Sequence, residues 1–267
     1  MNIENITLPL FLPAVRMDRL AKAVGPGADA IIFDLEDAVG PDDKDTARAL
    51  LVETLGKTPV RLPVLVRINA ESTPWYEADI LACADLPIDA VVLPKAETAD
   101  ACHDVSERTG KPVIALIETA LGMDNAKAIA GACRRLAFGS IDYAAHLGIA
   151  HMRDSLLHAR ATLVLAARLA GQTGPLDGVT TNIKDAEVIT SDSEHSVSMG
   201  FGGKLLIHPA QVQPSRTGFA PSQMELDWAH RVLEAASGGA AAVEVDGAMV
   251  DAPVLKRAGQ VISRAGG

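Results

Sequence analysis

The sequence predicts one eight-stranded (β/α) barrel followed by a short C-terminal hairpin and helix. Eight short aliphatic runs recur along the chain, and Ala-rich segments of helical period separate most of them. The composition is 48% hydrophobic but 3% aromatic, so the predicted core is mostly aliphatic. Apolar strands that alternate with helices are typical of a parallel sheet, and eight repeats favour closure into a barrel over an open sheet.

The predicted strands are short runs rich in Val, Ile, Leu and Ala, taken here in chain order. They cover residues 6–13, 30–35, 64–68, 90–93, 113–117, 136–139, 178–182 and 204–207. Between them the periodicity predicts helices that include residues 19–24, 43–55, 124–133 and 154–169.

The C-terminal part of the sequence predicts a lid segment beyond the barrel. A helix is expected over residues 222–236, followed by a flexible run with two adjacent glycines. Two short apolar runs flank Asp246-Gly247, as in a two-residue hairpin, and a last helix is expected to begin near Asp251. The predicted domains are therefore a catalytic barrel over 1–237 and a lid over 238–267.

Charge and cysteine content exclude several classes of protein. A formal net charge of −10 argues against nucleic-acid binding, which favours clustered Lys and Arg. No apolar run approaches the ~20 residues of a membrane span, and the first residues lack the positive charge of a signal peptide. The three cysteines form no CxxC pair. We therefore expect a cytoplasmic protein with ordinary thiols and no membrane or nucleic-acid partner.

Polar residues follow the predicted strands, where the reactive groups of a (β/α) barrel gather. Almost every aliphatic run ends directly in ionisable or amide side chains. These strand-end residues are Arg16, Asp34, Glu36, Asp37, Arg67, Asn69, Lys95, Glu118, Asp142 and His208. Their coincidence with seven strand ends predicts an active site at the mouth of the barrel.

Glu118 and Asp142 follow two consecutive strands, so one metal ion would be within reach of both. Two carboxylates without a nearby set of Cys or His ligands favour a hard ion such as Mg²⁺, which takes one or two carboxylates and is completed by water and substrate oxygens. The alternative interpretation is that Glu118 pairs with a cation and Asp142 caps the next helix.

Arg67 emerges from an aliphatic strand, and its guanidinium could hold a carboxylate or a developing enolate oxygen. A buried ion pair with Asp34 or Glu36 is the alternative, and both interpretations can hold together. The three acids Asp34, Glu36 and Asp37 exceed what one Mg²⁺ needs, so some are expected to accept hydrogen bonds from Arg67 and from metal-bound water.

Several motifs occur together in one order. They are LFLPAVRMDRLAKA, IIFDLEDAVGPDDKDTAR, VRIN, VVLPKAE, LIETALGMDNAKAIA, LAFGSIDYAAHLG, GFGGKLLIHPAQV and DGAMVDAP. In their order and spacing they resemble the HpcH/HpaI aldolase and citrate lyase β-subunit-like family, over residues 10 to about 258.

The resemblance implies a Mg²⁺-dependent barrel, trimeric or hexameric, that acts on a 3-hydroxy-3-carboxyacyl thioester of coenzyme A such as malyl-, citramalyl- or citryl-CoA. It implies metal ligands at Glu118 and Asp142 and a substrate-binding, catalytic arginine at Arg67. The family's acidic motif falls on Asp34, which implies substrate binding, and on Glu36 and Asp37, which implies catalytic roles.

By the same resemblance, Arg16 and Lys44 would contact phosphates of the substrate. Asp251 of the MVD motif would reach the active site of a neighbouring subunit and act as the catalytic acid or base. Asp251 as a cap of the last helix is the alternative.

The sequence leaves the reaction itself open. The main expectation is a carbon-carbon lyase that releases an acyl-CoA and an oxoacid. A malyl-CoA-type thioesterase would use the same residues, and aldol chemistry on free pyruvate is a third option. The chain could also be the β subunit of a citrate lyase complex, with an acyl carrier protein presenting the substrate.

Overall fold

The computed structural model describes residues 3–25, 27–57, 59–236 and 243–265 and divides them into two compact units, 1–215 and 216–267. The first unit contains an eight-stranded parallel sheet in the order β1 to β8. Its strands are β1 (Pro9–Pro13), β2 (Ala30–Asp34), β3 (Val64–Arg67), β4 (Ala90–Leu93), β5 (Val113–Ile117), β6 (Arg135–Phe138), β7 (Leu176–Asp177) and β8 (Gly203–Lys204).

The sheet closes on itself, so the predicted barrel is confirmed. Leu206, just after β8, forms a parallel bridge with Leu10 of β1. The Phe11 amide donates to the Leu206 carbonyl at 2.8 Å, and the Leu206 amide donates to the Pro9 carbonyl at 3.0 Å. These bonds satisfy backbone groups that an open sheet would leave unpaired.

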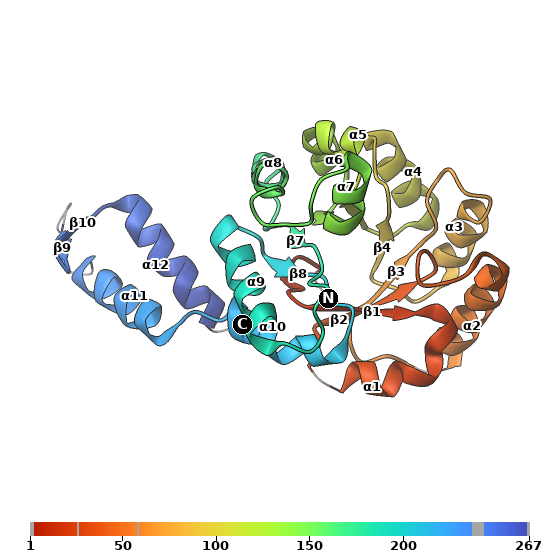
Figure 1. The fold of residues 1–267 in the computed structure, drawn as a ribbon, viewed down its shortest axis with the longest axis horizontal. Helices are drawn as coiled ribbons and strands as arrows, with labels where there is room; N and C mark the ends of the chain where they lie inside the picture. The colour runs from red at the N-terminus through yellow and green to blue at the C-terminus, as the bar shows by residue number, and fades with distance from the viewer. Residues whose placement is uncertain (1–2, 26, 58, 237–242, 266–267) are drawn as a thin grey trace. The chain divides into compact units, whose positions relative to one another are not determined.

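Helices follow the strands and lie outside them (Figure 1). They are α1 (Leu20–Val24), α2 (Lys44–Lys57), α3 (Tyr76–Asp85), α4 (Ala99–Thr109), α5 (Ala120–Asp124), α6 (Ala126–Ala132), α7 (Ser140–Leu147), α8 (Leu157–Leu169), α9 (Ala186–Met199) and α10 (Val212–Phe219). Short 3-10 helices are η1 (Ile3–Asn5), η2 (Ala14–Arg19), η3 (Pro41–Asp43) and η4 (Pro209–Gln211).

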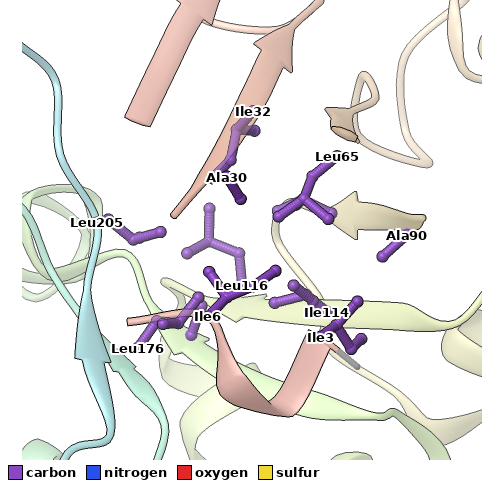
Figure 2. Close-up of a cluster of buried hydrophobic side chains, with 12 residues drawn as sticks. Ile3, Ile6, Ala30, Ile32, Leu65, Ala90, Ile114, Leu116, Leu176 and Leu205 are labelled. Atoms are coloured by element: carbon purple, nitrogen blue, oxygen red, sulfur yellow. The ribbon is translucent and has the colours of Figure 1, made fainter. Parts of the chain in front are cut away.

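The interior of the barrel is filled by aliphatic side chains that point toward one another (Figure 2). This cluster consists of Ile3, Ile6, Ala30, Ile32, Leu65, Ala90, Val92, Ile114, Leu116, Ala137, Leu176 and Leu205. Phe11 and Val179 pack against it. Burying each large aliphatic side chain contributes about 1.5–3 kcal/mol, so this cluster stabilises the closed barrel.

The predicted seventh strand over 178–182 is wrong, because β7 is Leu176–Asp177. The chain leaves the sheet at Gly178, where a Cβ would collide with the Ser140 side chain. Contacts of the buried Asp177 side chain stabilise this short strand. The Arg160 Nε donates to Asp177 Oδ1 at 3.1 Å, and the Ser196 hydroxyl donates to Asp177 Oδ2 at 2.6 Å. The predicted helix over 124–133 corresponds to α6, and a further short helix, α5, precedes it, with Asn125 between the two.

The second unit is a pair of helices with a hairpin. It contains α11 (Gln223–Ala236), β9 (Val243–Val245), β10 (Ala248–Val250) and α12 (Ala252–Ala265). Asp246 and Gly247 have φ of 53° and 78°, so the predicted two-residue turn is confirmed. Ala229, Val232, Val250, Ala258 and Val261 form its own small core. The predicted domain boundary between 237 and 238 lies outside the described residues.

Candidate active site

The carboxyl ends of the strands form one pocket of about 340 Å³. Acidic residues, one arginine and apolar side chains share its surface; they come from β1, β2, β3, β5 and β6 and from loops that include those after β7 and β8. The lining residues are Phe11, Pro13, Asp34, Asp37, Ala38, Arg67, Leu116, Glu118, Phe138, Gly139, Ser140, Ile141, Asp142, Val179, Leu205 and Ile207. The pocket therefore brings together Asp34, Asp37, Arg67, Glu118 and Asp142, as expected for a barrel mouth.

Glu118 follows β5 and is buried, with 2% of its surface exposed. The Lys95 amide donates to Glu118 Oε1 at 2.7 Å, while Glu118 Oε2 is buried without a hydrogen-bond partner among the described residues. Burial, and then the negative charge of Glu36, raise the pKa of Glu118 to about 8. A cation next to Glu118 would offset this unfavourable burial of charge.

Gly139 allows the Glu118 carboxylate to occupy this place. A Cβ at residue 139 would collide with Glu118 Oε2 and would lie 2.5 Å from Glu118 Cβ. No larger residue could therefore follow β6 without moving the carboxylate. Sequence reasoning did not single out this glycine, although a glycine directly after a strand is a signal of close approach.

Asp142 lies in the first turn of α7 and is exposed at the pocket. The N-cap of α7 is Gly139, without a side-chain cap hydrogen bond, so Asp142 does not cap this helix. Its charge also acts on Glu118, since it contributes to the raised pKa of that carboxyl. The helix-cap interpretation of Asp142 is therefore excluded.

Two carboxylates with an unsatisfied buried oxygen fit a hard divalent ion. Within the described residues, no three or more His, Cys, Asp or Glu side chains form a complete metal-ligand set. An ion held by Glu118 and Asp142 would take its remaining ligands from water and substrate, as Mg²⁺ commonly does.

Arg67 at the end of β3 makes the buried ion pair that the sequence offered as one interpretation. Its Nε and Nη2 donate to the two oxygens of Asp34 at 2.8 and 2.6 Å, and its Nη1 donates to Asp37 at 3.2 Å. The guanidinium lies 4.8 Å from the centre of the Phe11 ring. Arg67 is thus fixed in place as part of the pocket lining.

Glu36 lies behind the pocket rather than on its surface. Its Oε1 accepts from the Lys95 ammonium at 2.6 Å. Its Oε2 lies 3.1 Å from Arg67 Nη1 but is not aligned for a hydrogen bond. Burial raises the pKa of Glu36 despite the neighbouring charge of Arg67. We interpret Glu36 as a link between Lys95 and Arg67.

Lys95 is one of two non-glycine residues with positive φ in the described chain, at 47°. This conformation directs its amide to Glu118, while its ammonium reaches Glu36. Left-handed backbone at a non-glycine residue is uncommon and costs energy. The sequence contained no signal of this conformation.

Lys44 and Arg16, the two residues predicted to contact phosphates, lie in different environments. Lys44 is buried, donating to the carbonyls of Leu35 and Glu36 at 2.7 Å each, so it supports the acidic loop. Arg16 is half-buried, and its Nε donates to Asp18 at 3.0 Å. Phosphate binding by either residue stays a prediction, and the contacts of Lys44 leave it little freedom to turn outward.

Asp251 belongs to the second unit, where it begins α12. Its Oδ1 accepts from the Val254 amide at 3.2 Å, so Asp251 caps this helix. The carboxylate is exposed. A helix cap can also carry out catalysis, and the capping bond alone does not decide between the two roles.

The family is shown by comparison with known proteins. Residues 8–209 match the family model described as HpcH/HpaI aldolase/citrate lyase. The chain belongs to this family. None of its described helices is long and apolar enough to cross a membrane.

Relatives with different activities are about equally similar to the chain. The citrate lyase subunit beta of Leuconostoc mesenteroides subsp. cremoris is 38% identical, over 90% of this chain and 86% of that protein. A (3S)-malyl-CoA thioesterase of Cereibacter sphaeroides is 39% identical, over 96% of this chain and 93% of that protein.

A solved structure has the same fold over nearly the whole chain. It is a crystal structure of CitE from Mycobacterium tuberculosis in complex with magnesium, acetoacetate and coenzyme A. It has a TM-score of 0.89 and 37% identity, and the match covers 98% of each chain.

Proposed function

We propose that this protein is a Mg²⁺-dependent carbon-carbon lyase. Its substrate would be a 3-hydroxy-3-carboxyacyl-CoA, and its products an acyl-CoA and an oxoacid. The observation that carries the proposal is the convergence of Glu118, Asp142 and Arg67 in one pocket at the barrel mouth. Relatives that include a citrate lyase subunit and a protein crystallised with magnesium and coenzyme A support it.

Glu118 and Asp142 would hold the metal ion. When bound, Mg²⁺ would supply Lewis-acid polarisation of the substrate's hydroxyl and carboxylate. The unsatisfied Glu118 Oε2 and the space provided by Gly139 support this assignment.

The chain's own side chains would move the protons. Asp37 accepts the hydroxyl proton in this proposal; it lines the pocket, and its side chain is 55% exposed. The carbon-carbon bond then breaks, and its electron pair forms the enolate of the acyl-CoA. Arg67 stabilises the enolate oxygen, and Asp34 holds Arg67 through two hydrogen bonds.

Asp251 would protonate the enolate carbon, completing the acyl-CoA. We propose that it does so in the active site of a neighbouring subunit, which requires a homo-oligomer, either trimer or hexamer. A cytoplasmic location and a role for an acyl carrier protein stay predictions.

Hydrolysis is the second candidate, because a thioesterase is 39% identical to this chain. The test is to incubate the protein with malyl-, citramalyl- and citryl-CoA, with Mg²⁺ or EDTA, and to identify products by mass spectrometry. An acyl-CoA plus an oxoacid, lost with EDTA, is the expected result. Free CoA with a hydroxy acid would identify a thioesterase, and no turnover would contradict both candidates.

A further inference from the structure

We infer that Lys95 is a positioning residue for the metal site. Its ion pair with Glu36 holds a strained backbone conformation, and in that conformation the Lys95 amide fixes the Glu118 carboxylate. The inference rests on the proposed function, because it concerns how the chain presents a metal ligand. It goes beyond that function by giving a role to a lysine that is outside the described lining of the pocket.

The backbone at Lys95 is the first observation. Its φ of 47° lies in the left-handed region, where the Cβ of an L-residue crowds the following carbonyl. Asp246, the other non-glycine residue with positive φ in the described chain, lies in a two-residue hairpin turn that requires this conformation. Lys95 follows β4 and Pro94 and is not part of a hairpin. Its conformation therefore has to be stabilised by other contacts.

The contacts of Lys95 are the second observation. Its ammonium donates to Glu36 Oε1 at 2.6 Å, and its amide donates to Glu118 Oε1 at 2.7 Å. The next residue, Ala96, is joined to β5, because its amide donates to the Leu116 carbonyl at 3.2 Å. The chain after Lys95 is thus fixed by the barrel, while Lys95 itself is held by two carboxylates.

Glu36 is a well-fixed partner for the Lys95 ammonium. Its side chain is 7% exposed, and its Oε2 lies 3.1 Å from Arg67 Nη1. Its amide donates to Asp34 Oδ1 at 2.9 Å, and its carbonyl accepts from the Lys44 ammonium at 2.7 Å. An ion pair with a buried, fixed partner is screened less and loses less side-chain entropy than a fully exposed pair. This ion pair can therefore offset the strain at Lys95.

The Lys95 amide determines which oxygen of Glu118 is available to an ion. Because Oε1 accepts this hydrogen bond, Oε2 is the buried oxygen without a partner among the described residues. A relaxed backbone at Lys95 would turn the amide away and leave the carboxylate free to rotate. Metal affinity depends on the groups that orient a ligand through hydrogen bonds. We therefore expect Mg²⁺ binding to depend on the conformation of Lys95.

Two substitutions separate the ion pair from the backbone conformation. Lys95→Met keeps the apolar stem and the strain but removes the ammonium. Lys95→Gly also removes the ammonium, but glycine adopts a positive φ without strain. Both variants lose the same positive charge, so a difference between them reports the backbone. Lys57→Met is the control, because it removes the ammonium of an exposed pair with Glu53 in α2, also at 2.6 Å.

Hydrogen exchange of the residue 95 amide tests the inference without metal. It is measured by mass spectrometry on the full-length protein and corrected for the intrinsic exchange rate of each variant. We expect exchange at least about tenfold faster in Lys95→Met than in the wild type, and within about threefold of the wild-type rate in Lys95→Gly and Lys57→Met. Equal exchange in the two Lys95 variants would overturn the inference.

Magnesium binding tests the consequence for Glu118. Calorimetric titration should show at least about tenfold weaker binding of Mg²⁺ to Lys95→Met than to Lys95→Gly. These two variants are compared with each other because the loss of a nearby cation favours Mg²⁺ binding in both. Lys57→Met should bind Mg²⁺ as the wild type does. Equal affinities of the two Lys95 variants would contradict the inference.

A third variant removes the same ion pair from its other side, which keeps the inference testable if Lys95→Met does not fold. Glu36→Met should speed exchange of the Lys95 amide by at least about tenfold, and unchanged exchange would overturn the inference. The two proposals also fail separately. If the wild type bound no Mg²⁺ and cleaved no ester, the proposed function would fail, and amide exchange would still decide the role of Lys95. Mg²⁺-dependent cleavage with equal exchange in both Lys95 variants would overturn the inference and leave the lyase standing.

Discussion

One carboxylate oxygen of Glu118 accepts a hydrogen bond from the Lys95 amide, and the other has no hydrogen-bond partner in the described chain. Its pKa is raised from the ordinary value of 4.5 to about 8. Between these two pH values, the Glu118 carboxyl is protonated in the native state and ionised in the unfolded chain. The protonated Glu118 carboxyl therefore contributes stability below this pH range, and that contribution is lost as the pH rises through the range.

The metal-free protein should accordingly lose stability between about pH 5 and pH 8, and Mg²⁺ should restore it most at the higher pH. Thermal unfolding of wild type and Glu118→Gln, with and without Mg²⁺, measures this. The melting temperature of Glu118→Gln should depend less on pH than that of the wild type, and Mg²⁺ should raise it little. An identical Mg²⁺ effect in both proteins would contradict the assignment.

Gly139 offers a second test at the scale of a residue. Gly139→Ala places a methyl group against the Glu118 carboxylate, so we expect Mg²⁺ affinity to fall by about tenfold or more. Gly131→Ala is the matched control, because a Cβ there meets nothing within 4 Å and the site lies in α6. Calorimetric Mg²⁺ titration should separate the two, and equal affinities would contradict the expected displacement.

At the scale of elements, the strands were predicted best where several aliphatic residues are buried in succession. The bounds of β4 and β5 agree with the sequence prediction, and all their residues are buried. β7 differs from its predicted bounds. Only two residues pair in the sheet, a buried ion pair between Asp177 and Arg160 supports them, and the β-branched residues after Gly178 lie in a loop. Strand propensity alone does not reveal such a cluster.

The boundary between α5 and α6, which the sequence did not predict, also depends on a contact that is distant in sequence. The Asn125 side chain donates to the Glu97 carbonyl at 2.8 Å, so this residue joins two helices instead of continuing one. The helical period on either side is unbroken in the sequence. A contact with a distant carbonyl cannot be read from that period.

Two variants of Asp251, at the start of α12, separate its proposed role as an acid from its role as a helix cap. Asp251→Asn retains an N-cap but not an acid, whereas Asp251→Ala removes both. We expect both variants to lose at least about 100-fold in turnover, and only Asp251→Ala to lose about 1 kcal/mol of stability. Full activity in Asp251→Asn would leave helix capping as its role.

At the scale of the whole molecule, the barrel topology made the site predictable. Once the strands alternate with helices, their carboxyl ends must meet, so Arg67, Glu118 and Asp142 were expected together and line one pocket. The left-handed Lys95 and the apolar lining from Phe138 and Val179 were not foreseen. They depend on backbone conformation and side-chain direction, which spacing does not specify.

A shared active site is also testable at this scale. Glu118→Gln and Asp251→Asn proteins should each be inactive, and co-refolded mixtures should regain activity if Asp251 acts in a neighbouring subunit. Light scattering should show three or six copies of the 27.9 kDa chain. Mixed oligomers that form but stay inactive would place both residues in one subunit.

The central claim is that Glu118 and Asp142 hold the Mg²⁺ on which cleavage depends. The most direct test is turnover of the preferred ester against free Mg²⁺ concentration, for wild type, Asp142→Asn and the control Asp85→Asn, an exposed residue at the end of α3. We expect the half-saturating Mg²⁺ concentration to rise at least about tenfold in Asp142→Asn and to be unchanged in Asp85→Asn. Cleavage that persists in EDTA, or an unchanged Mg²⁺ dependence in Asp142→Asn, would contradict the claim.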